Sequence, residues 1–529
     1  MKHPKSTFSS LTRRSFLAEA AVAVAAVHPI TRALAQPVSS ARYKRYDLHS
    51  PQGQAMLKGY AVAVEAMLAL PPTHPHNWYR NAIVHMIDCP HGNWWFLPWH
   101  RGFTGCFEQT VRHYSGNPEF AFPYWDWTAH PYAPAAFFSG FLDPSHPKFI
   151  RSFEDFRSEF EEAIKQYYAG MTQAQRTQVE LRGYPDPETL LATIRGTGPK
   201  DTFFPDVANA RRKFDANRSL GTEAFFAVSA PVMECAFEAI TFEEFGSYRS
   251  PNHYKVQAFG AFEGYSHNLL HNDFQGFLQD MFSPVDPIFM VHHCNIDRLW
   301  SRWTRQQIAA GRDPLPTSGV DVWKAEPFVF FIGADGKPVA KQRAGDYFDE
   351  DQFEYEFVEA APRSKAMLMN VQPSPFSGQK FSSAGQAAPA DSRGATFSVS
   401  LPAPLLRAAA GPPRGLVAEI TVEGAPHQHG EKLNVFLNPA AGALDATSPS
   451  YLGSVEFFGV HHHSSMGSVV FTLPFCDALR RRLCEKTNTC KDNVPLEILV
   501  TAPQPKLLQA MPGMSAVEFK ATAVSVRAL

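Results

Sequence analysis

Histidines in this chain gather in three short segments that lie far apart in the sequence. The segments span residues 85–100, 267–271 and 292–293. None of them contains a Cys-x-x-Cys pair or an Asp-rich loop, and an all-imidazole donor set suits copper, zinc, iron or nickel rather than magnesium or calcium. Six imidazoles can hold two metal ions with three nitrogens each, which leaves open positions for a shared small ligand. A fold that uses these histidines together must bring the three segments to one place.

The second and third segments have the spacing of helices. His267 and His271 are four residues apart, so on a helix both rings project from one face. Asn268 stands where the H-E-x-x-H motif of a zinc peptidase has its glutamate, which disfavours a zinc hydrolase. His292 and His293 are adjacent and point roughly 100° apart on a helix. Only one of the two can face the same metal ion, and the other is expected to be a buried, hydrogen-bonded neighbour of the site.

Longer motifs around these histidines resemble those of one protein family. The motifs are His91-Gly-x-Trp-x-Phe-Leu-x-Trp-His100-Arg, Pro123-Tyr-Trp-Asp-Trp127, His267-Asn-x-x-His271 and Asp286-Pro-Ile-Phe-x-x-His-His-x-Asn-x-Asp-Arg-Leu-Trp300. Their combination is similar to the tyrosinase, catechol oxidase and molluscan haemocyanin family, and in order and spacing most similar to bacterial tyrosinases. The resemblance implies a mainly α catalytic domain, a four-helix bundle around a coupled dicopper centre, followed by a C-terminal all-β, sandwich-like domain.

The resemblance also implies a residue for each ligand position of the dicopper centre. One copper ion would take the first three histidines of the set and the other ion the last three: His85, His91 and His100, then His267, His271 and His293. His74 and His76 compete with His85 for the first position, and His85 is preferred because it lies on a probable helix beside apolar residues. His292 would then support the site without binding metal.

Three further positions match residues with roles in the family, and a fourth is predicted from its place in the sequence. Glu263 would orient a water molecule with the help of Asn268, so that the water removes the proton of a phenol; ordinary helix-surface pairing is the alternative for Glu263. Cys89 has the Cys-x-His spacing to His91 that some members use for a thioether, and a plain buried thiol is the alternative. Phe282 lies shortly before the Asp286-Pro287 pair of the last motif, and from this position it is predicted to stack on the substrate ring near the entrance.

The chain divides by composition into four parts. Residues 1–35 contain Arg13-Arg14 ahead of a short apolar stretch and a small-x-small cleavage site, which is typical of a twin-arginine signal peptide. Residues 36–370 are predicted to be the dicopper catalytic domain, 371–395 a Ser/Ala/Gly/Pro-rich linker, and 396–529 a β-domain that shields the active site. The mature protein is therefore expected to be periplasmic or secreted, without a membrane span.

The function that follows from the resemblance is the oxidation of phenols by O2 with two copper ions. Monophenols would be hydroxylated at the ortho position and o-diphenols oxidised to o-quinones. The β-domain would keep the enzyme latent by inserting an apolar side chain near the metals, with Glu456–Val460 as the candidate region. The alternatives are a catechol oxidase or o-aminophenol oxidase without the hydroxylation step, and a haemocyanin-like oxygen binder. The partners would be small phenols and catechols, with a homo-oligomer possible; the formal charge of −2 gives no sign of nucleic-acid binding.

Overall fold

The structure is a computed structural model of the 529-residue chain. It describes residues 42–195, 212, 216–359, 378–385, 394–409, 415–424, 432–439, 444–458, 467–475, 494–501 and 520–528. The predicted signal peptide and most of the predicted linker lie outside these residues. By its contacts, Tyr43–Leu529 makes one compact unit. Within the described residues, no helix has the length and apolar character needed to cross a membrane.

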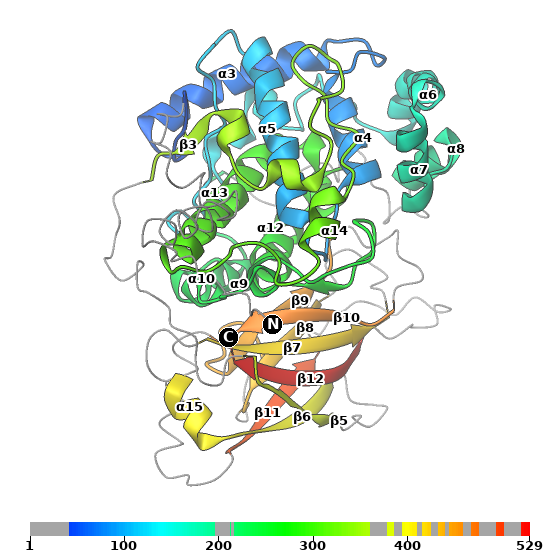
Figure 1. Ribbon diagram of the computed structural model, residues 1–529. Coiled ribbons are helices and arrows are strands. Elements are labelled where there is room, and N and C mark those ends of the chain that lie inside the picture. The colour runs from blue at the N-terminus through cyan, green and yellow to red at the C-terminus, as the bar shows by residue number, and fades with distance from the viewer. Residues whose placement is uncertain are drawn as a thin grey trace, which may run out of the picture. The chain divides into compact units, whose positions relative to one another are not determined.

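Five helices form the centre of the helical domain, and three of them cover segments with predicted helical spacing. They are α3 (Pro51–Leu68), α4 (Trp78–Asp88), α5 (Phe96–Tyr114), α12 (Asn268–Phe274) and α13 (Ile288–Ala309). The helix α3 begins where a sequence signal places it, since the Ser50 hydroxyl caps the amide of Gly53 and a proline follows at the first position. Figure 1 shows α4 and α5 in blue beside α12 and α13 in green.

Further helices surround this centre. The remaining α-helices of the domain are α6 (Phe153–Gly170), α7 (Gln173–Arg182), α8 (Pro187–Arg195), α9 (Thr222–Ala227), α10 (Ala230–Phe237), α11 (Phe242–Phe245) and α14 (Val320–Ala325). The 3-10 helices are η1 (Ala135–Phe138), η2 (Gly140–Leu142), η4 (Gly276–Gln279), η5 (Ser283–Val285), η6 (Ala344–Tyr347) and η7 (Asp351–Phe353). A π-helical turn, η3 (Phe262–His267), leads directly into α12. Such turns are rare and occur frequently at functional sites.

The C-terminal part is β-rich, as predicted. Its strands are β4 (Lys380–Ser382), β5 (Ala384–Gly385), β6 (Gly394–Leu401), β7 (Leu416–Glu423), β8 (Lys432–Leu437), β9 (Tyr451–Glu456), β10 (Val469–Pro474), β11 (Val494–Thr501) and β12 (Lys520–Ala528), with one helix, α15 (Ala403–Ala409). They form two five-stranded sheets, β2-β10-β7-β12-β4 and β5-β6-β11-β8-β9. The strand β2 (Ala258–Phe259) comes from the helical domain and pairs in parallel with β10. The strands β4 and β5 lie inside the predicted linker.

A buried ionic cluster holds the beginning and end of the helical domain together. The strand β1 (Tyr43–Arg45) pairs in parallel with β3 (Tyr355–Phe357). The Asp297 carboxylate of α13 accepts hydrogen bonds at 2.8 Å from Arg45 Nη1 and at 2.6 Å from Arg101 Nε. The Tyr355 hydroxyl also donates to Asp297. From the sequence alone, Asp297 could pair with its neighbour Arg298 or accept a proton from a ligand imidazole; its partners in the structure are Arg45, Arg101 and Tyr355.

Candidate metal centre

The structure brings all six predicted ligand histidines into one buried cluster. His100 and His293 stack with ring centroids 4.4 Å apart, and the His85 ring lies 5.7 Å from the His100 ring. The His91 and His267 rings are 5.6 Å apart. The six side chains come from α4, the turn after it, α5, the end of η3, α12 and α13. All are buried, so segments far apart in sequence meet at one dry site.

Backbone carbonyl groups orient several of these rings. The Nδ1 atoms of His85, His100 and His271 lie 2.6, 2.8 and 2.6 Å from the carbonyl oxygens of Met281, Phe96 and Leu278. A carbonyl only accepts hydrogen bonds, so each Nδ1 carries the proton and each Nε2 has a free lone pair. Histidines that bind metals in proteins are oriented in this way, because their second ring N–H donates to a fixed acceptor.

Four of the free ring nitrogens have no hydrogen-bond partner among the described residues, and two others lie close together. Within the described residues, the Nε2 atoms of His85, His91, His100 and His267 are buried without a hydrogen bond. The His271 and His293 Nε2 atoms lie 3.3 Å apart. Burial lowers the pKa of His100 and of His271 to about 3, and it lowers the pKa of the other cluster histidines well below the usual value. Neutral imidazoles with unpartnered Nε2 atoms fit metal binding, because the orphaned lone pairs need a buried cation.

Two subsets of the cluster have metal-binding geometry by themselves. His267, His271, His292 and His293 each offer an atom within 4.8 Å of the others, and so do His85, Cys89 and His91. His292 thus offers a ring nitrogen to the same group as His293. Its ring packs on Trp127 with centroids 4.9 Å apart, whereas His293 faces His100. His293 remains the predicted metal ligand, and His292 lies next to it.

The two competitors of His85 lie elsewhere and are otherwise engaged. His76 uses Nδ1 with the Tyr114 hydroxyl at 3.2 Å and Nε2 with the Gly333 carbonyl at 2.9 Å. The Nδ1 atom of His74 accepts the amide of His76. Both side chains therefore stabilise the turn before α4 and the loop around Gly333.

Glu263 is fully buried and accepts two hydrogen bonds from the protein. The Gly92 amide donates to its Oε1 at 2.7 Å, and the Ser247 hydroxyl donates to its Oε2 at 2.5 Å. Burial raises the pKa of this carboxyl to about 8. It is not the exposed helix residue of the alternative interpretation. Its contact with Gly92 places it one residue from His91.

Asn268 connects a cluster histidine to the β-domain. Its Oδ1 lies 2.9 Å from Nδ1 of His267 and accepts that proton, which turns Nε2 of the ring toward the cluster. Its Nδ2 donates to the Glu456 carbonyl at 3.0 Å. Both polar ends of the Asn268 side-chain amide are therefore hydrogen-bonded. The amide orients the His267 ring in the same way as the backbone carbonyls orient the three rings described above.

Cys89 lies between two of the cluster histidines. Its Sγ is 3.5 Å from Nδ1 of His91 and 3.6 Å from Nδ1 of His85. Burial raises the pKa of the thiol well above its usual value. Cys89 is a buried free thiol in this structure, next to the ring to which a thioether would attach.

Phe458 of the β-domain covers the histidine cluster. The sequence predicted the segment that approaches the metals, but it did not identify this residue. It lies within the predicted Glu456–Val460 segment, of which residues 459 and 460 fall outside the described chain. Its ring centroid is 4.4 Å from that of His271 and 4.8 Å from that of His91. The side chain is almost fully buried, so it closes the site on the side of the β-domain.

The strand that precedes Phe458 is seated tightly on η3. Tyr265 donates its hydroxyl to the Leu452 carbonyl at 3.1 Å. Gly453 has a φ of +154°, and a Cβ there would lie 2.6 Å from the Tyr265 hydroxyl. Only glycine allows this approach of β9 to the helical domain.

Phe282 does not lie at an open entrance as predicted. Its side chain is fully buried, and its ring packs edge-on against Phe156 of α6 with centroids 5.5 Å apart. The residue precedes η5, a short helix whose three residues are all buried. Position in sequence alone could not show that the loop before α13 is folded inward.

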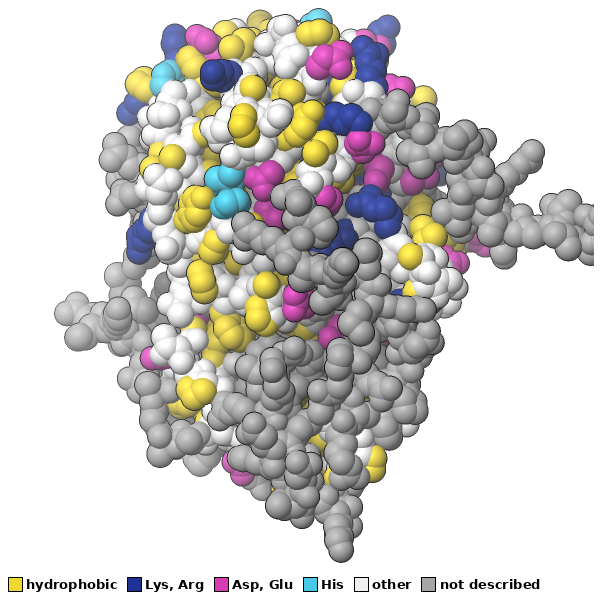
Figure 2. All heavy atoms as spheres, turned by 90° about the vertical axis from the view of Figure 1, so that its left-hand side faces the viewer, with side chains coloured by type: hydrophobic (Ala, Val, Ile, Leu, Met, Phe, Trp, Pro, Cys, Tyr) yellow, Lys and Arg dark blue, Asp and Glu magenta, His cyan; other side chains and the backbone are white. Residues whose placement is uncertain are grey.

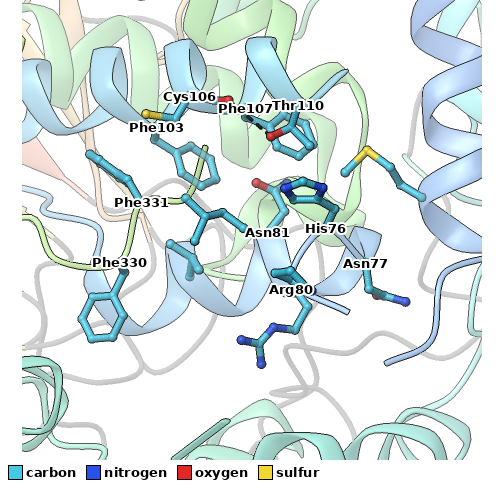
Figure 3. A pocket seen from close by; sticks show the side chains of 14 residues that line it. His76, Asn77, Arg80, Asn81, Phe103, Cys106, Phe107, Thr110, Phe330 and Phe331 are labelled. Atoms are coloured by element: carbon cyan, nitrogen blue, oxygen red, sulfur yellow. Dashed lines mark hydrogen bonds between the residues drawn. The ribbon is translucent and has the colours of Figure 1, made fainter. Parts of the chain in front are cut away.

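A cavity of about 40 Å³ lies behind the cluster (Figure 3). Figure 3 shows Phe103, Phe107 and Phe331 around it, with the side chains of Asn81 and His76 toward its interior. Phe103 also lies against His85, with ring centroids 6.1 Å apart. One aromatic layer therefore separates this cavity from the histidines.

Sequence comparison places the helical domain in a known family. Residues 61–306 match the common central domain of tyrosinase. A tyrosinase of Hahella sp. (strain CCB-MM4) is 28% identical over 257 residues, which cover 47% of this chain and 43% of that protein. A chloroplastic polyphenol oxidase of Malus domestica is 24% identical over 306 residues, 53% of this chain and 42% of that protein. The chain thus spans less than half the length of these curated relatives.

Solved structures with the same fold extend the likeness into the β-rich part. Latent apple tyrosinase is similar with a TM-score of 0.51 at 17% identity, over 93% of this chain and 98% of that one. A latent aurone synthase, a polyphenol oxidase, gives a TM-score of 0.53 at 18% identity over 88% and 87%. At this identity the structures establish the fold alone. The match over residues 61–306 and the buried histidine clusters together show that the helical domain is of the tyrosinase and polyphenol oxidase family of type-3 copper proteins.

Proposed function

We propose that this protein oxidises phenols with O2 at two copper ions, hydroxylating monophenols at the ortho position and converting o-diphenols to o-quinones. The observation that carries the proposal is the set of buried, unpartnered Nε2 atoms that converge from three distant segments. His85, His91 and His100 hold one ion in this proposal, and His267, His271 and His293 hold the other. The copper ions supply O2 activation and accept electrons from the phenol.

The protein orients four of the six ligand rings before any metal arrives. Carbonyl oxygens of Met281, Phe96 and Leu278 and the amide of Asn268 each hold one Nδ1 proton. Each ring therefore needs little reorientation when it binds, which lowers the entropic cost of forming the site.

Glu263 is the candidate base for the phenolic proton. An ordinary glutamate has a pKa of about 4.3 and a phenol one of about 10, so an ordinary carboxylate is a weak base for this task. Burial raises the pKa of Glu263 to about 8, which makes its ionised form a stronger base and brings its titration near neutral pH. A water molecule between Glu263 and the substrate would relay the proton, with Asn268 as the second partner of that water.

The latent state is proposed to depend on Phe458. Its ring occupies the side of the cluster that faces the β-domain, against His91 and His271. A phenol ring that approaches from this side must displace it. Cleavage or loosening of the β-domain would then open the site.

Export through the twin-arginine pathway belongs to the same proposal. It is supported by Arg13-Arg14 ahead of an apolar stretch and by the small residues before Gln36. Sequencing the N-terminus of protein recovered outside the cytoplasm tests it, with a start at Gln36 expected and a start at Met1 contradicting it.

A specific observation favours oxidation of diphenols alone as the second candidate function. Both carboxylate oxygens of Glu263 already accept hydrogen bonds from Gly92 and Ser247. If these bonds persist during turnover, the carboxylate is less available to a catalytic water. The site would then act only on catechols, which are more acidic than simple phenols and easier to oxidise.

Oxygen uptake by copper-loaded protein tests the proposal. The protein is given L-tyrosine and then a catechol, before and after limited proteolysis in the segment beyond residue 372. Uptake with both substrates, faster after proteolysis, is the expected result. Uptake with catechol alone supports the second candidate. Reversible O2 binding without net uptake contradicts both and supports an oxygen carrier.

A further inference from the structure

His253 is a buried histidine that lies outside the metal cluster, between two acidic side chains. Figure 2 shows histidine side chains exposed on one face of the molecule, whereas His253 has no exposed area. Its Nδ1 lies 2.6 Å from Oε1 of Glu326, which directly follows α14. Its Nε2 lies 3.2 Å from Oδ1 of Asp88, the last residue of α4. One imidazole ring therefore connects the ends of two helices that are far apart in the sequence.

The geometry requires a proton on both ring nitrogens of His253. A carboxylate only accepts hydrogen bonds, and a neutral imidazole has just one N–H to donate. An imidazole is ordinarily more basic than a carboxylate by about two pKa units, so the proton resides on the ring and not on an acid. The Trp99 indole donates to the second oxygen of Asp88 at 2.7 Å, which stabilises the ionised carboxylate. His253 is therefore an imidazolium ion held by two carboxylates.

The two acids outweigh the cost of burying this positive charge. Burial by itself lowers the pKa of His253, but the hydrogen bonds and charges of Asp88 and Glu326 raise the pKa above its usual value. The folded protein thus binds this proton more tightly than the unfolded chain, in which a histidine has a pKa of about 6.5. The stabilisation is complete below about pH 6.5 and is lost as the pH rises through the raised pKa.

Two other ionisable side chains approach the ring, and neither changes its charge near neutral pH. Tyr254 packs on His253 with ring centroids 3.9 Å apart, and burial raises the pKa of its hydroxyl well above the usual value. The Arg182 guanidinium lies 5.6 Å from the centre of the Tyr254 ring, and an arginine stays charged in proteins. A change of charge above neutral pH therefore arises at His253 and not at these neighbours.

His253 is attached to both ends of the loop that carries His91. Asp88, which accepts from the ring, comes directly before this loop. Near the other end, the side-chain amide of Asn93 donates to the backbone carbonyl of His253 at 3.0 Å. The four residues between these two anchors, 89–92, include His91.

The position of the His91 ring depends on this loop. The residue belongs to no helix, because α4 ends at Asp88 and α5 begins at Phe96. Its Nδ1 lies 3.5 Å from Sγ of Cys89, which is a weak acceptor and belongs to the same loop. The four rings whose Nδ1 protons have oxygen acceptors are held more firmly. A shift of the loop therefore moves the His91 ring with it.

We propose that His253 is a positioning residue of the metal centre, which as an imidazolium ion between Asp88 and Glu326 fixes the loop that carries His91. The inference rests on the proposed function, in which His91 holds copper. Loss of the ring proton removes one of the two hydrogen bonds and leaves two carboxylates without the positive charge between them. The loop then loosens, and the copper ion that His91 helps to hold is bound more weakly.

Copper affinity at two pH values tests the proposal on the full-length protein. The dissociation constant of the weaker-bound copper ion is measured by competition with a Cu(II) chelator, at pH 6.5 and at pH 9.5. Glutamine carries no charge, so His253→Gln should bind this ion about tenfold more weakly than the unaltered protein at pH 6.5. At pH 9.5 the two proteins should bind alike, because the unaltered protein has then lost the same charge.

The matched control is the exposed His113→Gln, which should bind copper like the unaltered protein at both pH values. A purely structural role of the His253 ring would give the same defect in His253→Gln at pH 6.5 and at pH 9.5. That outcome overturns the proposal, and so does a His253→Gln protein without a defect at either pH.

Asp88→Asn separates the charge of the His253 ring from its shape. The asparagine amide can donate to Nε2 of a neutral ring, while its oxygen still accepts from the Trp99 indole. The ring then needs no second proton. Asp88→Asn should therefore bind copper like the unaltered protein at pH 6.5 and about tenfold more tightly than the unaltered protein at pH 9.5. Equal affinities of the two proteins at pH 9.5 contradict the proposal.

Neutron diffraction from crystals grown without copper observes the proton directly. Deuterium on both ring nitrogens of His253 is expected at pH 6.5. Deuterium on one nitrogen alone overturns this inference and leaves the proposed function untouched. Two deuterium atoms on the ring, in a protein that binds fewer than two copper ions, contradict the proposed function instead.

Discussion

The ring of Phe458 lies 4.4 Å from the ring of His271, between centroids, although the two residues belong to different parts of the chain. Phe458 lies two residues after the end of β9 in the β-domain, and His271 lies on α12 of the helical domain. The contact joins the metal cluster to the domain that covers it. The consequences of this contact and of its neighbours can be measured.

Replacing Phe458 with alanine should activate the full-length protein. A buried phenylalanine contributes about 1.5–3 kcal/mol to the closed arrangement, so the rate of catechol oxidation should rise about tenfold or more. Phe457→Ala is the matched control, because its ring packs on Phe259 and Phe471 rather than on the histidines. Equal rates for Phe458→Ala and the unaltered protein would show that this ring does not limit access.

The folded protein should lose stability as the pH rises, because the buried carboxyl group of Glu456 then loses its proton. Burial raises the pKa of its carboxyl to about 8, and Asp273 adds to the rise. The folded state therefore binds this proton more tightly than the unfolded chain, in which the pKa is about 4.3. Its stabilising contribution is full below about pH 4 and is lost as the pH rises through about 8. Denaturant unfolding at pH 5 and pH 8.5 measures the loss.

Two variants isolate the contribution of Glu456 to this pH dependence. Glu456→Gln cannot ionise, so the difference in unfolding free energy between the two pH values should shrink. The exposed Glu423→Gln should keep the full difference. A pH dependence that is the same in both variants would exclude Glu456 as its source.

Glu263→Gln should separate the two oxidation steps. Loss of a general base slows proton transfer by about 10²–10⁴-fold, so hydroxylation of a monophenol should fall by about a hundredfold. Oxidation of a catechol should fall less, because its proton leaves more easily. Initial rates across pH 6–9 are the measurement, with an inflection near pH 8 expected only in the unaltered protein. Equal losses with both substrates would point to a structural role for Glu263.

Asp297→Asn should destabilise the helical domain strongly. Asp297 holds Arg45 and Arg101 in a buried cluster, and removing one partner of a buried ion pair costs about 3–5 kcal/mol. The thermal unfolding midpoint should drop accordingly. Glu161→Gln, which alters an exposed pair with Arg157, should leave the midpoint unchanged. Similar midpoints for the two variants would contradict the role assigned to the cluster.

Local patterns predicted the elements that carry the site. The spacing of the segments around His267 and His292 predicted the helices α12 and α13, and it placed His267 and His271 on one face. The resemblance to a family then predicted that the three segments meet. Alternating β-type runs predicted the β-rich domain. These features depend on residues close together in sequence.

Features that depend on distant contacts were not predicted. The sequence suggested the neighbouring Arg298 or a ligand imidazole as the partner of Asp297, yet its partners Arg45 and Arg101 come from remote parts of the chain. The predicted linker contains β4 and β5, since pairing with β12 and β6 orders a segment whose composition favours a loop. The inward fold of Phe282 and the approach of Phe458 likewise depend on packing between elements.

Anomalous X-ray scattering at the copper absorption edge, from crystals of the copper-loaded protein, tests the central claim most directly. The account predicts two strong copper peaks inside the helical domain, one among His85, His91 and His100 and the other among His267, His271 and His293. A single peak in the cluster, or peaks bound to other side chains with these six rings unligated, would contradict it.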